Sequence, residues 1–103
     1  MDDKYLQGRS SLQSVSIDDL LYELENGNFL FIQSVDDPDC EYGYSYFDGK
    51  TKRLIDGGVF NLDAGSEKEV LEEAMSWAGV TAGTTYELVE EEADLESLGF
   101  TGF

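Results

Sequence analysis

Apolar residues follow two different spacings along the chain, and the change of spacing predicts where helices and strands lie. Positions 17, 20, 21 and 24 are Ile, Leu, Leu and Leu, which is the i, i+3, i+4, i+7 spacing of one helix face. Ser16 before them is a preferred N-cap residue, and Gly27 after them is a typical helix end. A helix is therefore expected from Ser16 to Gly27.

Three strands are predicted between that helix and residue 60. Phe29–Ile32 is a short continuous apolar run, which is typical of a central strand. Tyr42–Phe47 has tyrosine at every second position, and Asp48-Gly49 after it is a preferred two-residue hairpin turn. The return strand is then expected over Thr51–Ile55. The paired glycines in Asp56–Gly58 predict a bulge or bend after it.

A second helix and a further strand are predicted in the rest of the chain. Ser66 and Glu69 form a capping box, and Gly79 is a typical helix end. The apolar residues that share the face of this helix are Val70, Leu71, Ala74, Trp77 and Ala78. Thr84–Val89 has the residue preferences of a strand. Ala93–Leu98 is expected to form a short acidic helix.

These elements predict an α+β fold, with a mostly antiparallel sheet of about four strands and two helices packed on one face. The sheet would be a three-stranded meander plus one strand. A length of 103 residues suits one core, so residues 1–15 are expected to form an N-terminal arm and residues 16–103 a single acidic α+β domain. Tyr42, Tyr44 and Tyr46 would either pack under a helix or form an exposed contact stripe, and core packing is favoured for Tyr44.

Charge is the feature that bears most on function. The chain has 23 Asp and Glu against six Lys and Arg, a formal net charge of -17. Most carboxylates therefore face water or a partner. Direct binding to nucleic acid or to an anionic membrane is disfavoured, because both carry the same sign of charge. A basic nucleic-acid-binding protein is the expected partner, and acidity that only keeps the chain soluble is the competing interpretation.

Two groups of carboxylates are the candidates for binding that partner. The first follows and includes the last predicted strand, with Glu87, Glu90, Glu91, Glu92, Asp94 and Glu96. The second is a loop with Asp36, Asp37, Asp39 and Glu41. Carboxylates on a rigid surface can occupy a basic groove that binds phosphates. The loop also has the oxygen ligands that calcium prefers, but its acids and glycine do not follow EF-hand spacing, so no metal or cofactor is expected.

Catalysis has few groups to use in this chain. There is no histidine, Cys40 is the only cysteine, and no phosphate-binding or dinucleotide-binding motif is present. The chain is therefore not expected to be an enzyme. A lone cysteine suits a reducing compartment. The first residues lack a signal-peptide pattern, and no apolar run approaches the ~20 residues that span a bilayer, so a cytoplasmic location is expected.

In size, acidity and predicted architecture, the chain resembles small acidic anti-defence proteins of phages and conjugative elements, such as anti-CRISPR and antirestriction proteins. A second, local similarity lies in Tyr46-Phe47-Asp48, in Ile55–Phe60 and in the second predicted helix. These segments resemble small domains of large polyvalent proteins of mobile elements. The resemblance implies stoichiometric inhibition of a nucleic-acid-handling enzyme in the host cytoplasm, with no catalytic residue.

The function predicted from the sequence is a non-catalytic inhibitor that binds the basic nucleic-acid groove of a CRISPR effector or restriction enzyme as a nucleic-acid mimic. One alternative is an immunity protein that neutralises a basic nuclease toxin. Another is an accessory interaction domain of a mobile element. The sequence leaves the target and the oligomeric state open.

Overall fold

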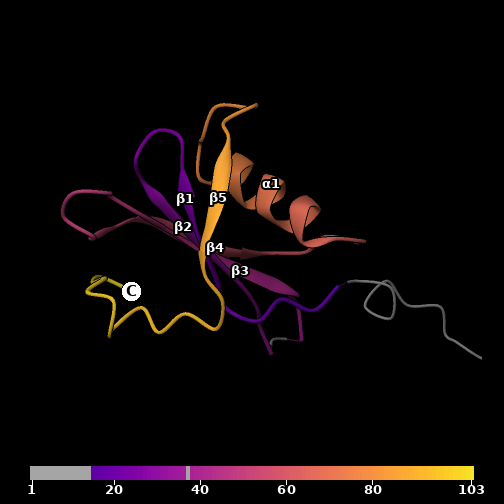
Figure 1. Ribbon diagram of the computed structural model, residues 1–103. Coiled ribbons are helices and arrows are strands. Elements are labelled where there is room, and N and C mark those ends of the chain that lie inside the picture. Colours follow the sequence, from indigo (N-terminus) through magenta and orange to yellow (C-terminus); the bar gives the residue numbers. More distant parts are fainter. Residues whose placement is uncertain (1–14, 37) are drawn as a thin grey trace, which may run out of the picture.

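The computed structural model describes residues 15–36 and 38–103, which form a five-stranded antiparallel sheet and one α-helix (Figure 1). The strands are β1 (Leu20–Leu24), β2 (Phe29–Ser34), β3 (Tyr42–Phe47), β4 (Leu54–Phe60) and β5 (Tyr86–Glu90), and the helix is α1 (Glu67–Trp77). The sheet order is β4-β3-β2-β1-β5, so α1 connects one edge to the other. The fold is mostly β, and the prediction of four strands with two helices on one face is wrong. The predicted arm, residues 1–15, lies outside the described residues except for Val15.

The segment predicted as the first helix is strand β1. Leu20, Tyr22 and Leu24 alternate on the face under α1, and Leu21 lies on the other face, where it is also buried. A strand buried on both faces lacks a clean alternation of apolar and polar residues, so its leucines also fitted the helical spacing. Asp19, within the first turn of the expected helix, has a left-handed backbone with a φ of 54°, which a right-handed helix does not allow.

The hairpin between β3 and β4 is longer than predicted. The Asp48 carboxylate accepts hydrogen bonds from the backbone N–H groups of Lys50 at 3.0 Å and Thr51 at 2.7 Å, so the turn extends beyond Asp48-Gly49. β4 pairs with β3 through the segment 56–58, so the bulge or bend expected from the paired glycines does not fall there. The register shift falls just before it, at Ile55.

Helix α1 begins and ends as predicted. The Ser66 hydroxyl accepts the backbone N–H of Glu69 at 3.3 Å, and Gly79 follows the helix with a φ of 80°. The buried residues of α1 are Val70, Leu71, Ala74 and Met75. Trp77, which was expected on this face, is 57% exposed. One helix face thus covers one face of the sheet.

The tyrosines of β3 belong to the core under α1, which confirms the core interpretation. Tyr42, Tyr44 and Tyr46 are all buried. Their hydroxyl groups reach polar partners at the rim of this core: Tyr42 donates to the Val15 carbonyl, and Tyr44 donates to the Asp56 carboxylate at 2.8 Å. Satisfied hydroxyl groups allow tyrosine to fill a buried position.

The C-terminal segment covers the opposite face of the sheet. Phe100 is buried, and its ring lies 4.6 Å from the ring of Phe47. The Leu54 N–H donates to the Thr101 carbonyl at 2.9 Å, which ties the segment to the start of β4. Residues 95–99 form turns, so the short helix predicted over Ala93–Leu98 is wrong. The sheet has α1 on one face and the C-terminal segment on the other (Figure 1).

Candidate functional site

One end of the sheet gathers carboxylates from three separate segments. In the antiparallel register Leu20 pairs with Ile32 and Leu21 with Glu90, so β1 begins where β2 and β5 end. The segment before β1, the β2–β3 loop and the turn after β5 therefore lie along the same end (Figure 1). The acidic end is defined here as Asp18, Asp19, Asp36, Asp39, Glu41, Glu90, Glu91 and Glu92.

Backbone hydrogen bonds hold these segments beside one another. The Ser34 N–H donates to the Ile17 carbonyl at 3.1 Å, and the Glu92 N–H donates to the Asp18 carbonyl at 3.2 Å. Asp19 and Glu92 have left-handed backbones, with φ values of 54° and 50°. Such a conformation costs a residue with a side chain about 1–3 kcal/mol. Carboxylates therefore stand at two positions where glycine would be unstrained.

The acidic surface continues along β1 and β5. Glu23 and Glu87 are direct cross-strand partners, and both are exposed. Like charges directly opposite each other on a sheet are destabilising. Glu25 follows on the same face, where its carboxylate accepts the backbone N–H and the hydroxyl of Thr85, both at 3.2 Å. The repulsion between Glu23 and Glu87 thus lowers the stability of the fold, and because both side chains are exposed, their burial does not offset it.

The hydroxyl of Tyr22, under α1, lies near carboxylates from two other segments. Burial raises the pKa of Tyr22, and the nearby Glu67, Tyr86 and Glu91 raise it further. Glu67 comes from the first turn of α1 and Glu91 from the turn after β5. Carboxylates from the helix and from the acidic end therefore converge near one buried hydroxyl.

Three of the four bases among the described residues lie away from the acidic end. Lys50, Lys52 and Arg53 are in the β3–β4 turn, at the opposite end of the sheet. The Lys52 ammonium donates to the Leu98 carbonyl at 2.9 Å and stands 5.3 Å from the centre of the Phe100 ring. The fourth described base, Lys68, lies beside Glu67 in the first turn of α1 and lines the pocket next to β5. The sheet is therefore charged unequally from end to end.

The structure places the predicted residues in three locations. Glu87 and Glu90 lie in β5, and Glu91 and Glu92 lie in the turn after it, whereas Asp94 and Glu96 belong to the C-terminal segment on the far face. The Ser97 hydroxyl donates to Asp94 at 2.8 Å, and this bond lowers the pKa of Asp94. Of the second group, Asp36, Asp39 and Glu41 lie at the acidic end, and Asp37 lies outside the described residues. Parts of both groups therefore come together, without Asp94 and Glu96.

Four carboxylates of this surface were missed by the sequence interpretation. They lie in the segment predicted as the first helix and were not among the candidate residues: Asp18, Asp19, Glu23 and Glu25. Counting Tyr22 as apolar gives Leu20, Tyr22 and Leu24 a period of two, which is the signal of a strand. That signal would have set Glu23 on the opposite face from the core.

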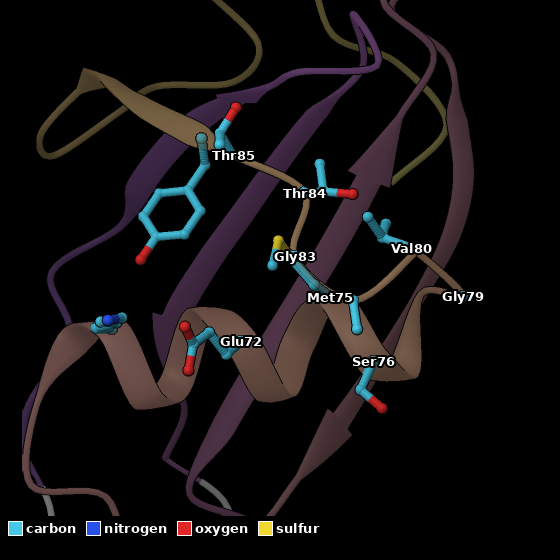
Figure 2. A pocket seen from close by; sticks show the side chains of 11 residues that line it. Glu72, Met75, Ser76, Gly79, Val80, Gly83, Thr84 and Thr85 are labelled. Carbon is cyan, nitrogen blue, oxygen red and sulfur yellow. The ribbon is translucent and has the colours of Figure 1, made fainter.

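A pocket of about 720 Å³ lies between α1 and the segment that leads into β5 (Figure 2). Its apolar residues include Met75, Val80 and Tyr86, the first residue of β5. Glu72 points toward it from α1, and Thr84 lines the other side. This volume is within the range of pockets that hold small-molecule ligands.

The described residues contain no group of three or more Cys, Asp or Glu side chains placed to hold a metal ion. Within the same residues, no helix has the length and apolar character needed to cross a bilayer.

No protein family, curated protein sequence or solved structure matches the chain. Its function is therefore inferred from the surfaces described above.

Proposed function

We propose that the chain is a non-catalytic inhibitor that binds the basic nucleic-acid groove of a CRISPR effector or a restriction enzyme, where its carboxylates take the place of phosphates. The observation that supports this most directly is the acidic end, which collects carboxylates from three segments while three of the four described bases lie at the opposite end of the sheet. A groove built for phosphates presents Lys and Arg to its ligand. Close charge pairs across an interface couple by about 1.5–7 kcal/mol, so a few such pairs suffice for tight inhibition.

The position of the carboxylates distinguishes this proposal from acidity that serves solubility alone. Solubility needs net charge on the surface, and it does not need carboxylates that repel each other or that stand on a strained backbone. Here Glu23 faces Glu87, and Glu92 keeps a left-handed backbone. Both arrangements lower the stability of the folded chain. Carboxylates at positions where they lower stability are better explained by binding to a partner than by solubility.

The test is a cleavage assay in which the purified protein is added to CRISPR effectors, restriction enzymes and nuclease toxins at low salt. We expect the wild-type protein to inhibit a member of the first two classes. The variant Glu91→Lys/Glu92→Lys should weaken that inhibition by more than about tenfold. The matched control Glu73→Lys/Glu96→Lys changes the charge equally but away from the acidic end, and should have an effect below about threefold.

The outcomes separate the alternatives. Inhibition of a toxin alone would overturn the anti-defence assignment and identify an immunity protein. Equal losses in both double variants would mean that only net charge matters. Absence of inhibition of every nuclease would overturn the proposal and leave the accessory interaction domain.

A further inference from the structure

Strand β5 forms an open edge of the sheet. It pairs with β1 on one side and with no other described strand on its outer side (Figure 1). The Glu25 N–H donates to the Thr85 carbonyl at 2.8 Å, and antiparallel bonds recur at every second residue. Glu23 and Glu87 therefore form the next hydrogen-bonded pair after Glu25 and Thr85. Leu88 is the residue after this pair, so its backbone N–H and C=O groups point away from β1. A row of outward backbone groups is a template for another strand.

The face of β5 that lies under α1 is apolar. Tyr86 and Leu88 pair with Leu24 and Tyr22, which belong to the core under the helix. Leu88 nevertheless remains 40% exposed. Tyr86 also lines the pocket of about 720 Å³ between α1 and the segment before β5 (Figure 2). An apolar side chain on a strand added beside β5 would pack on Leu88, next to this pocket.

On the opposite face of β5, the part of the strand that pairs in regular register with β1 presents Glu87, whereas Val89, at the register shift, is an exposed apolar residue. Glu87 lies directly beside Glu23, and with Glu25 these residues line a hollow of about 460 Å³. A Lys or Arg side chain above this face would form charge-assisted hydrogen bonds and would separate two like charges. The same strand therefore offers apolar contacts on one face and carboxylates on the other.

We propose that the open edge of β5 accepts an extended segment of the basic partner as a sixth strand, and that this segment alternates apolar and basic side chains. Successive side chains of a strand point to opposite faces, so one set would meet Leu88 and the other would meet Glu87. Strand addition of this kind takes affinity from backbone hydrogen bonds and specificity from the alternate side chains. This inference deepens the proposed function and rests on it, because that function supplies a basic partner.

Charge decides against a second copy of the chain as the occupant of this edge. Each copy carries a net charge of -17, and pairing β5 with β5 would bring Glu87 and Glu90 of both copies into one interface. Like charges across strands are destabilising. A basic segment reverses the sign of these interactions.

The test uses a capped peptide of about eight residues in which lysine and valine alternate, a length that matches a typical strand. Amide resonances of the labelled full chain are followed by NMR during titration at low salt. The first control peptide has the same composition with all lysines before all valines. The second has the alternating order with N-methylated backbone nitrogens, which removes its hydrogen-bond donors. We expect the alternating peptide to shift the amides of residues 86–90 and to bind at least about tenfold more tightly than either control.

Leu88→Pro provides the matching change in the protein. Proline is tolerated in an edge strand where the N–H faces solvent, so the variant should keep the wild-type spectrum while losing affinity for the alternating peptide. Equal binding of all three peptides would reduce the interaction to charge and overturn the inference about the strand, while the cleavage assay with Glu91→Lys/Glu92→Lys still tests the proposed function. Shifts at β5 that depend on the concentration of the protein itself would assign the edge to a second copy and would also overturn it.

Discussion

Replacing Glu87 by lysine should stabilise the fold, because Glu87 faces another carboxylate. Glu23 and Glu87 are exposed cross-strand partners. Two unit charges about 6 Å apart interact by roughly 0.7 kcal/mol in water, and cross-strand charge pairs contribute about 0.2–1 kcal/mol. Reversing one charge turns the repulsion into an attraction of similar size, so the change in interaction energy is about twice that of one pair. After screening, the free energy of unfolding should rise by about 1 kcal/mol at low salt.

Urea unfolding followed by circular dichroism measures this gain. At about 500 mM salt the screening length falls to roughly 4 Å, and most of the gain should disappear. The double variant Glu23→Gln/Glu87→Lys is the matched control, since its lysine has no carboxylate opposite and should keep little of the gain. A lower free energy of unfolding for Glu87→Lys, or a gain that is unchanged without Glu23, would contradict repulsion between these two carboxylates. The same substitution should weaken binding of the alternating peptide, so that stability and binding move in opposite directions.

Three further results are expected. Phe100→Ala should lower the free energy of unfolding by about 3–5 kcal/mol, because the ring is buried against Phe47. Phe103→Ala is the control: this side chain is 61% exposed, so the free energy of unfolding should change by less than about 1 kcal/mol. Similar values for both variants in urea unfolding would contradict the role given to the C-terminal segment. Glu92→Gly should raise the free energy of unfolding by about 0.5–1 kcal/mol, since glycine adopts a positive φ without strain. The same variant should weaken nuclease inhibition. A lower free energy of unfolding would contradict backbone strain at this position. Burial and the hydrogen bond to a carboxylate raise the pKa of Tyr44 to about 12. The contribution of the protonated phenol to stability is therefore present below about pH 10 and is lost as the pH rises through 12. Ultraviolet titration should show a phenol that ionises at high pH and that is absent in Tyr44→Phe.

The elements that were predictable from the sequence have local signals. The tyrosine alternation in β3 and the apolar run in β2 predicted two strands, and the cap at Ser66 with Gly79 predicted α1. β1 was harder to predict, because Leu21 is buried on the other face and adds a helical spacing to the period of two formed by Leu20, Tyr22 and Leu24. Burial on both faces depends on which segments cover the sheet, and that is a property of the tertiary structure.

The C-terminal segment and the acidic end show the same limit. Phe100 has few apolar neighbours in sequence, and its partner Phe47 lies in another strand. The runs of carboxylates were visible, but their meeting at one end follows from the pairing of Leu21 with Glu90 and of Leu20 with Ile32. Candidate residues could therefore be predicted, whereas the surface they form required the strand order.

The distance in sequence between β1 and β5 has a consequence for how the binding surface forms during folding. Strands β1 to β4 are joined by short connections, whereas Glu25 and Thr85 bond across 60 residues. Loops that close over longer stretches of chain form more slowly. We expect the meander to fold first, with β1 as its temporary edge, and β5 to dock only after α1 has crossed the sheet. In hydrogen exchange, β5 should accordingly open before the central strands. A nascent chain that has folded only as far as β4 would thus have neither the complete acidic end nor the edge that receives a partner.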